Sequence, residues 1–522
     1  MRRFNVTGLC LPNEDYMVDI SGKIEQIRKL VDDRCYFTIN RARQYGKTTT
    51  LAWLSKTLAD EYLVASISFS RIGEGGFESQ ESFCNAFLRL VHRAFEMSDA
   101  PSEYKESWFD PDVTTFLDLS EHITKMCKDK KVVLMVDEVD KTSNNRVFLH
   151  FLEMLRDKFL ERKNGSDYTF HSVILAGVYD IKNIKLKMMN EGTYTPTATE
   201  NKIYNSPWNI AVSFKVDMSF NPDEIATMLA EYEADHKTGM DITAIAVEIF
   251  SYTSGYPFLV SRICQCVDEE LGKDWTHRGV QEAVQMMLVE QNTLFDDMIK
   301  NIENNRDLFG FLFDLIFVGE EYVLNADNPV INLGLMYGFI KIGEHGKVKV
   351  ANRIFELRMS NYFVSKEATS NRRITGVLQR DVVDGDRFDM ELCLRKFADH
   401  YAEIFSGRDA EFIEREGRLL FLSFLKPLIN GQGFYHIESQ FTDLRRMDIV
   451  VDFGSDQFII ELKLWKGESA HEKAYEQLAG YLDSKGAGTG YLLTFDFRKN
   501  ETKQPRSEWV DFGGKRIFDV VV

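Results

Sequence analysis

The chain of 522 residues lacks any long hydrophobic run. No stretch approaches the roughly eighteen apolar residues that a membrane-spanning helix requires. The opening residues, MRRFNVT, carry charge but lead into no apolar segment of the kind found in a secretory signal. We therefore expect a cytoplasmic protein that neither crosses a membrane nor uses one as a partner.

The sequence also lacks the cysteine patterns of metal and disulfide sites. Its 7 cysteines are scattered, with no C-x-x-C pair and no histidine at metal-ligand spacing. We interpret them as reduced thiols, most of them in the core. No G-x-S-x-G segment and no cysteine–histidine signature points to a serine or cysteine hydrolase.

Positive charge is scarce. The formal net charge of −18 disfavours a protein that coats nucleic acid with a broadly basic surface. Most of the acidic excess precedes residue 366, however, and residues 366–522 are nearly balanced in charge. A local basic groove that binds DNA is therefore still compatible with the composition of that part. With 44% hydrophobic and 28% charged residues and no low-complexity segment, the composition predicts a globular chain of several domains.

The most informative segment that is present is RARQYGKTTT at residues 41–50. It follows an apolar run at residues 35–40 and precedes a helical pattern, so the order is strand, loop, helix. Backbone N–H groups of such a loop bind phosphate, Lys47 would reach the β- and γ-phosphates, and Thr48 would hold Mg²⁺. An ordinary strand-to-helix turn is the alternative. The predicted nucleotide contacts of this loop are Arg41, Tyr45, Gly46, Lys47, Thr48 and Thr49.

A second motif favours the nucleotide interpretation. Residues 131–140, KVVLMVDEVD, read as a buried parallel strand that ends in two acids. Asp137 suits the metal-side carboxylate, and Glu138 suits the base that orients an attacking water. The alternative is a strand that merely ends in an acidic turn. Together the two motifs predict binding and hydrolysis of ATP with Mg²⁺, with Asp137 and Thr48 at the metal.

The phosphate-loop string resembles that of a known group. It is similar to the arginine-rich loop, of the type R-P-R-R-F-G-K-[ST], of bacterial AAA-ATPase-like proteins, which are similar to the signal-transducing STAND ATPases. Arg41 stands where the usual first glycine would be, as expected within that group. Ala42 departs from the usual proline.

Further matches extend this resemblance over residues 1–365. Residues 173–180 match the next core strand, and residues 206–211 precede another. The Gly255-Tyr256-Pro257 segment resembles the G-x-P segment that senses nucleotide in the lid, which implies that Pro257 contacts the nucleotide. The resemblance thus implies a P-loop AAA-like ATPase core at residues 1–220.

Residues 221–365 predict a lid. Helical patterns run to about residue 317. Residues 328–356 then read as a helix and two short strands around a glycine-containing turn, which suggests a winged-helix unit. Such a unit closes the ATPase region in STAND-like proteins, and we favour a packing role for it over DNA binding.

The composition of the sequence changes again after residue 365. A polar stretch at residues 366–386 predicts a linker to a separate domain at residues 387–522. Within that domain we predict two helices and then three strands. Their ranges are 390–405 and 410–429 for the helices, and 433–440, 447–453 and 457–464 for the strands.

Three charged residues on the predicted strands form a candidate catalytic group. Alternate side chains of a strand share a face, so Glu461 and Lys463 point together, and Asp448 on the preceding strand can lie across from them. Two carboxylates could hold Mg²⁺ or Mn²⁺, and the lysine could position water, as in metal-assisted phosphodiester cleavage. Gln477 and Tyr481, at i and i+4, share one helical face.

These residues resemble the PD-(D/E)xK nuclease superfamily, in the version that AAA-ATPase-like proteins carry at their C-terminus. Asp448 matches the first acid, Glu461 and Lys463 match E-x-K, and Gln477 with Tyr481 matches the following Q-x-x-x-Y. Glu416 is the match to the helical acid. An exposed strand with an ion pair is the alternative. We interpret His471 as a solvated residue at a helix start rather than a metal ligand.

The sequence therefore predicts an α/β chain with a P-loop AAA-like core, a helical and winged-helix lid, and a restriction-endonuclease-like α/β domain. The resemblance implies an ATP-dependent switch, acting through the lid or self-association, that controls a metal-dependent nuclease in DNA processing or defence. The alternative is a regulatory ATP-binding protein whose C-terminal domain is a non-catalytic binding module.

Overall fold

The computed structural model describes most of the chain. It covers residues 2–98, 100–139, 146–178, 208–318, 322–370, 382–384, 387–405, 414–429, 433–439, 447–454, 456–496 and 506–522. The chain divides into two compact units. They comprise Met1–Met287 with Asn332–Phe339, and Leu288–Ile331 with Ile340–Val522. The predicted domain limits at residues 220, 365 and 386 remain predictions.

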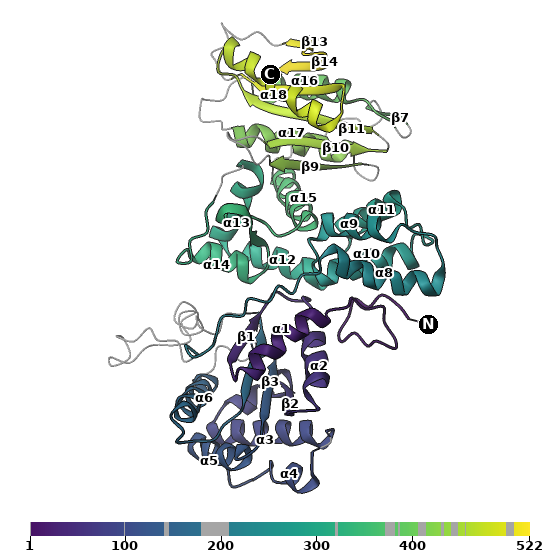
Figure 1. Ribbon diagram of the computed structural model, residues 1–522. Helices are drawn as coiled ribbons and strands as arrows, with labels where there is room; N and C mark the ends of the chain where they lie inside the picture. Colours follow the sequence, from purple (N-terminus) through teal and green to yellow (C-terminus); the bar gives the residue numbers. More distant parts are fainter. Residues whose placement is uncertain are drawn as a thin grey trace, which may run out of the picture. The chain divides into compact units, whose positions relative to one another are not determined.

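The first unit contains a four-stranded parallel sheet in the order β1-β4-β3-β2. Figure 1 labels β1, β2 and β3 of this sheet. The strands are β1 (Tyr36–Asn40), β2 (Leu63–Ser68), β3 (Val132–Asp137) and β4 (Ser172–Gly177). A parallel bridge from Phe37 to Val212 continues the sheet beyond β1. The predicted α/β class is therefore confirmed for this unit.

The strands are apolar because both faces of the sheet are covered. Every residue of β3 and β4 is buried, as expected for a parallel sheet between helices. One face packs against α3, α5 and α6, and the other carries α1 and α2. The helices of this core are α1 (Ser21–Asp32), α2 (Lys47–Leu58), α3 (Gln80–Glu96), α4 (Ser102–Glu106), α5 (Phe116–Cys127) and α6 (Arg146–Asn164).

Four further helices of the first unit make up the region that the sequence predicts as a lid, and we call them the lid helices (Figure 1). They are α8 (Pro222–His236), α9 (Ile242–Thr253), α10 (Pro257–Glu269) and α11 (His277–Val289). The start of α8 is specified locally, because Asn221 forms a capping box with Glu224 and Pro222 occupies the first turn. The predicted helical character of this region is confirmed.

The second unit begins with helices and a hairpin. These elements are α12 (Thr293–Asn304), α13 (Arg306–Phe313), the π-turn η6 (Asp314–Val318), α14 (Pro329–Met336), β5 (Ile340–Ile342), β6 (Val348–Val350) and α15 (Arg353–Ser370). The end of α14 belongs to the first unit. Strands β5 and β6 pair antiparallel around the 3-10 turn η7 (Glu344–Gly346). The predicted helix, strand, turn and strand are therefore present, whereas a winged-helix role remains a prediction.

A six-stranded sheet in the order β13-β14-β12-β11-β10-β9 occupies the C-terminal part of the second unit. Its strands are β9 (Gly433–Ser439), β10 (Met447–Phe453), β11 (Asp456–Leu464), β12 (Thr489–Phe495), β13 (Arg506–Phe512) and β14 (Lys515–Val521). A separate two-stranded pair comprises β7 (Val383–Asp384) and β8 (Arg387–Phe388). The predicted strands coincide with β9, β10 and β11 to within one residue at each end.

Helices cover both faces of this sheet as well. The helices are α16 (Met390–Phe405), α17 (Glu414–Ile429) and α18 (Glu468–Lys485). Side chains of α18 form a core with Val450, Ile459 and Leu492 on one face. Phe397 of α16 and Gly417 of α17 lie against Phe495, whose side chain points to the opposite face from Leu492. Residues 410–413 of the second predicted helix lie outside the described residues.

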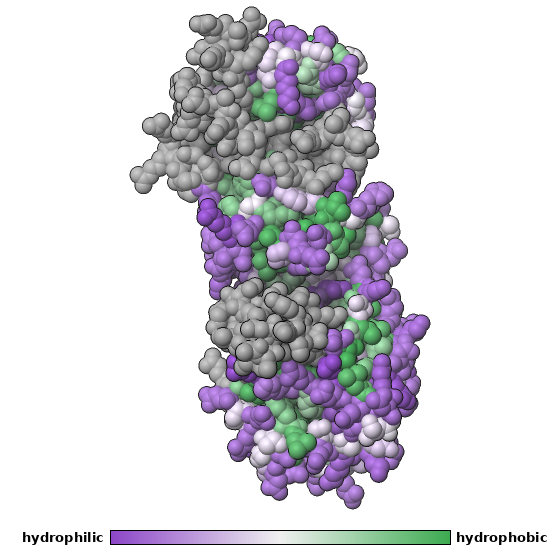
Figure 2. All heavy atoms as spheres, turned by 90° about the vertical axis from the view of Figure 1, so that its left-hand side faces the viewer, coloured by the Kyte–Doolittle hydropathy of each residue, from purple (hydrophilic) through white to green (hydrophobic). Residues whose placement is uncertain are grey.

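Two expectations from composition can be compared with the fold. The 7 cysteines are reduced thiols, and all but Cys10 and Cys35 are buried, as predicted. In the part of the chain that the structure describes, no helix is long and apolar enough to cross a membrane. Figure 2 shows hydrophilic residues over most of the visible described surface, with hydrophobic residues exposed in smaller groups.

Candidate functional site

The phosphate loop lies between the end of β1 at Asn40 and the start of α2 at Lys47. Its backbone turns sharply, because Gln44 has φ 55° and Gly46 has φ 74°. A left-handed residue directly before a helix turns successive N–H groups toward one side, which creates an anion-binding concavity. The loop therefore has the backbone shape that the sequence motif predicts.

The ammonium of Lys47 closes this loop. Its Nζ donates to the carbonyl oxygens of Arg41 at 2.9 Å and Ala42 at 2.8 Å. These bonds hold the positive charge beside the loop and the first turn of α2, where the positive end of the helix dipole also lies. Both the ammonium and the helix dipole would attract an anionic phosphate bound in the loop.

The two predicted magnesium ligands lie side by side. Thr48 Oγ1 donates to Asp137 Oδ2 at 2.7 Å, although 89 residues separate them in sequence. Asp137 is buried at the end of β3, and its Oδ1 accepts from the backbone N–H of Glu138 at 2.9 Å. A hydroxyl and a carboxylate oxygen are hard donors of the kind that Mg²⁺ prefers, so this pair fits that ion.

Glu138 follows in a strained conformation, with φ 56°. Its Oε2 accepts from Ser68 Oγ at 3.1 Å. Ser68 ends β2, and its Cα pairs with that of Asp137 across the sheet. Sequence analysis overlooked Ser68, although a polar residue at the end of an apolar strand beside the acidic pair was an available signal.

Arg41 and Tyr45 make contacts within the protein. Arg41 donates to the carbonyl of Val216 at 2.8 Å, and its guanidinium lies 5.4 Å from the Phe214 ring centroid. Burial lowers the pKa of Arg41 and raises the pKa of Tyr45. The Tyr45 ring lies edge-on to that of Tyr256 in the lid, with centroids 4.7 Å apart. Direct contact of Arg41 and Tyr45 with nucleotide remains a prediction.

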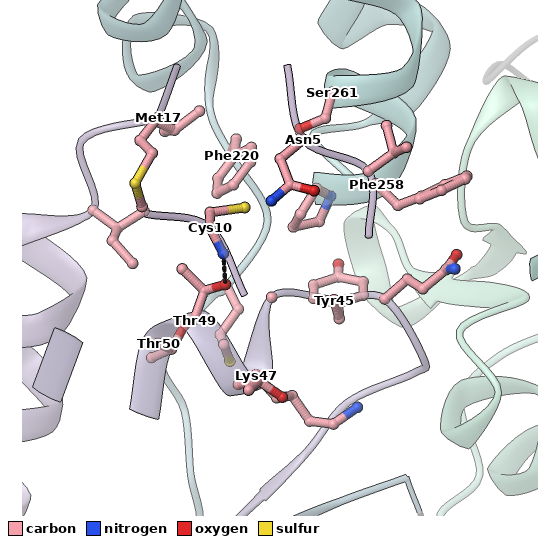
Figure 3. A pocket seen from close by; sticks show the side chains of 18 of the residues that line it. Asn5, Cys10, Met17, Tyr45, Lys47, Thr49, Thr50, Phe220, Phe258 and Ser261 are labelled. Atoms are coloured by element: carbon pink, nitrogen blue, oxygen red, sulfur yellow. Dashed lines mark hydrogen bonds between the residues drawn. The ribbon is translucent and has the colours of Figure 1, made fainter. Parts of the chain in front are cut away.

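A cavity of about 280 Å³ adjoins the loop (Figure 3). The N-terminal segment, the phosphate loop, the segment before α8 and the start of α10 supply its walls. Cys10 N–H donates to Thr49 Oγ1 at 3.3 Å, which ties the N-terminal segment to α2. Pro257 also lines the cavity, and its contact with nucleotide remains a prediction. Sequence analysis assigned no role to the N-terminal segment.

The N-terminal segment is also fastened to the lid. Arg2 donates to Glu231 Oε2 at 2.7 Å and to Asp235 Oδ2 at 3.0 Å, and Tyr16 OH donates to the same Asp235 oxygen at 3.0 Å. These ion pairs and hydrogen bonds join residues more than two hundred positions apart along the chain. The cavity therefore has a wall that both core and lid hold in place.

In the C-terminal sheet, the three charged residues predicted as a catalytic group lie on the neighbouring strands β10 and β11. The backbone of Asp448 in β10 pairs with that of Glu461 in β11. Glu461 is buried, and its Oε1 lies 2.8 Å from Lys463 Nζ. The side chains of Asp448 and Glu416 lie outside the described residues. Among the described side chains, no group of three or more acids, histidines or cysteines is placed to hold a metal.

The two predicted auxiliary residues lie on α18. Gln477 is half-buried, whereas Tyr481 is buried in the core between α18 and the sheet. Lys485 lies over the Tyr481 ring, 5.6 Å from its centroid. This burial gives Tyr481 a packing role, and any role of Gln477 at the charged group remains a prediction.

The prediction of a solvated His471 is wrong. His471 is buried near the start of α18, and its Nε2 lies 2.9 Å from Asp519 Oδ2. Tyr475 OH and Arg506 Nε donate to the same oxygen at 2.7 and 2.8 Å. Strand β14 brings Asp519 beneath the helix from 48 residues away, which no local pattern reveals.

A curated protein is similar to about half of this chain. An uncharacterized WD repeat-containing protein of Synechocystis sp. is 22% identical over 262 residues, which are 47% of this chain and 20% of that protein. The chain thus spans about a fifth of the length of the curated relative that it matches.

Two solved structures match this chain at low sequence identity and low TM-score. A Walker-type ATPase of Pyrococcus abyssi matches with 10% identity and a TM-score of 0.46, over 68% of this chain and 99% of that one. The ORC2 protein of Aeropyrum pernix, in ADPNP–ADP complexes, matches with 12% identity and a TM-score of 0.37, over 70% and 98%.

The family comparison is decisive. Residues 14–326 match the family described as AAA-like domain. This match includes the phosphate loop, the parallel sheet with its acidic strand end, and the lid helices. Since it spans more than half of the chain, the protein belongs to the AAA-like domain family.

Proposed function

We propose that the protein binds and hydrolyses ATP at the phosphate loop of its first unit. The observation that carries this proposal is the 2.7 Å contact between Thr48 Oγ1 and Asp137 Oδ2, directly beside the loop that Lys47 closes. Two motifs far apart in sequence converge there with the spacing that a nucleotide and its metal need.

Each residue has a separate task in this proposal. Lys47 and the loop N–H groups bind the β- and γ-phosphates. Thr48 and Asp137 would hold Mg²⁺, which when bound neutralises charge on the phosphate oxygens. Glu138 orients the attacking water and accepts its proton, and Ser68 steadies that carboxylate by its hydrogen bond at 3.1 Å.

The cavity beside the loop suits the base and ribose of the nucleotide. Figure 3 shows Met17, Cys10 and Phe220 around it, and Asn5 and Ser261 add polar groups at its edge. A mostly apolar wall with a few polar groups is typical of small-molecule sites. We therefore place the base against the N-terminal segment.

A threonine substitution tests this assignment. Thr48→Val keeps the side-chain shape but removes the hydroxyl, so the affinity for ATP should lose most of its dependence on Mg²⁺. Thr57→Val is the matched control, because Thr57 lies on the same helix and its hydroxyl donates to Trp53 O at 3.0 Å. Calorimetric titration with ATP, with and without Mg²⁺, gives the answer. An unchanged Mg²⁺ dependence in Thr48→Val contradicts the proposed metal site.

We further propose that the C-terminal domain has the nuclease-like fold and that the nucleotide state of the first unit controls its activity. The pairing of Asp448 with Glu461, and the 2.8 Å contact of Glu461 with Lys463, support this second function. Asp448 and Glu461 would supply carboxylate oxygens to a divalent ion. By this proposal the partner is DNA, and self-association accompanies the change of nucleotide state.

Plasmid cleavage separates an active nuclease from a binding module. The purified chain should nick plasmid DNA with Mg²⁺ or Mn²⁺, with a rate that depends on ATP. Glu461→Gln should remove nicking, whereas Glu472→Gln, an exposed acid on α18, should not. If the parent cuts no nucleic acid under any nucleotide condition, the binding-module alternative replaces the nuclease.

A further inference from the structure

Three consecutive carbonyls of the phosphate loop are held by side chains. Lys47 holds those of Arg41 and Ala42, at 2.9 and 2.8 Å. The third, that of Arg43, accepts a hydrogen bond from the hydroxyl of Tyr256, which lies 213 residues away in the lid. The lid therefore completes a set of contacts that begins within the loop itself.

Tyr256 is well placed to act as a fixed donor. It is buried, with 2% of its surface exposed, and its ring meets the Tyr45 ring edge-on. Burial raises the pKa of Tyr256 well above its ordinary value, so the hydroxyl keeps its proton over the whole physiological range. Breaking this contact would cost a hydrogen bond that a buried hydroxyl makes, and such a loss is unfavourable.

The backbone on either side of Tyr256 leaves it little freedom. Gly255 has φ 72°, and a Cβ there would lie 1.8 Å from the carbonyl oxygen of Phe220, so only glycine fits. Phe220 N–H donates to Gly255 O at 2.8 Å. Pro257 follows as the first residue of α10 and lies close to Gly46 of the loop. Tyr256 is the N-cap residue of α10, so its hydroxyl links the start of that helix to the phosphate loop.

We propose that Tyr256 is a positioning residue through which the lid holds the phosphate loop in its anion-binding conformation. By fixing the Arg43 carbonyl away from the phosphate side, its hydroxyl helps the neighbouring N–H groups to point inward. Nucleotide affinity and lid docking are then coupled, and each strengthens the other. This inference rests on the proposed nucleotide site and names the lid contact that regulates it.

Tyr256→Phe tests the contact by removing one oxygen atom. Tyr36→Phe is a closely matched control, because Tyr36 is also buried and its hydroxyl donates to a backbone carbonyl, Phe170 O, at 3.1 Å. That carbonyl does not belong to the loop. The two variants should lose similar thermal stability, but Tyr256→Phe alone should bind ATP and ADP roughly 2- to 10-fold more weakly.

Hydrogen exchange gives a readout that loss of packing alone would not produce. Without nucleotide, Tyr256→Phe should exchange faster than the parent at both residues 42–46 and the first turn of α10. ATP should slow exchange at both segments in the parent and in Tyr36→Phe, but only at the loop in Tyr256→Phe.

The outcomes separate this inference from the proposed function. If the parent binds no nucleotide, the proposed function fails and the role of Tyr256 fails with it. If the parent binds ATP and Tyr256→Phe matches it in affinity and in exchange at both segments, the nucleotide site stands and the inference about Tyr256 is overturned.

Discussion

Replacing Lys47 by alanine tests the centre of the proposed nucleotide site. In the structure its ammonium donates to two loop carbonyls, at 2.9 and 2.8 Å. Hydrogen bonds that involve a charged group contribute about 1.5–3 kcal/mol each. The lysine thus both stabilises the loop and would supply the positive charge for phosphate.

The expected loss in affinity follows from these contacts. Lys47→Ala removes at least one charged contact to phosphate and releases the carbonyls of Arg41 and Ala42, which together cost about 3 kcal/mol or more. This corresponds to ATP binding that is weaker by roughly 100-fold or more. Adenosine has no phosphate and its base would occupy the neighbouring cavity, so its affinity should change by no more than about twofold.

Titration calorimetry with Mg²⁺ and ATP, and competition by adenosine, measure both quantities. Lys56→Ala is the matched control, because Lys56 is exposed on the same helix and at its far end. Thermal melting of each variant checks that the fold persists. If Lys47→Ala binds ATP with the parental affinity, Lys47 is not the phosphate lysine and the assignment of the loop is wrong.

Four further substitutions address the remaining groups. Glu138→Gln should retain ATP affinity and lose roughly 10²- to 10⁴-fold in the rate of phosphate release, since it removes a base but no phosphate contact; parental turnover would make Glu138 structural. Asp448→Ala should weaken Mn²⁺ binding in a calorimetric titration, whereas Lys463→Ala should retain or strengthen it by removing a nearby positive charge. Equal Mn²⁺ affinity of Asp448→Ala and parent would exclude Asp448 as a ligand. Burial and neighbouring positive charges lower the pKa of His171 from 6.5 to about 4. The unfolded chain therefore binds more protons than the folded chain between these pH values, so the parent should lose stability as the pH falls through this window. His171→Phe should lose less unfolding free energy than the parent over the same pH range. Urea unfolding at several pH values measures this, and an equal pH dependence of the two proteins would contradict this reasoning.

Much of the fold could be predicted from the sequence because its signals are local. The apolar run before the phosphate loop is β1, and the predicted helix at residues 390–405 and strand at residues 447–453 coincide with α16 and β10. Burial on both faces produces continuous apolar strands, and one-sided burial produces helical periodicity, so such elements are visible along the chain. The predicted site residues also lie where their motifs place them: Lys47 contacts the phosphate loop, and Thr48 contacts Asp137.

The orientation of other site residues could not be predicted in this way. Arg41 occupies the position expected from the motif, yet its guanidinium donates to Val216 O. His471 follows a polar helix start, yet it is buried against Asp519. In both cases the partner comes from a distant segment, and a one-dimensional pattern carries no record of which segments meet.

The sequence by itself therefore determined the phosphate loop, the acidic strand end and the class of each unit, because backbone geometry and helix or strand periodicity depend on neighbouring residues. Tertiary structure alone decided how the lid reaches that loop. Tyr256 contacts Arg43 across 213 residues, and Arg2 contacts Asp235 across 233. Such contacts form only when the packing of whole helices and sheets brings distant backbone and side-chain groups within hydrogen-bonding distance.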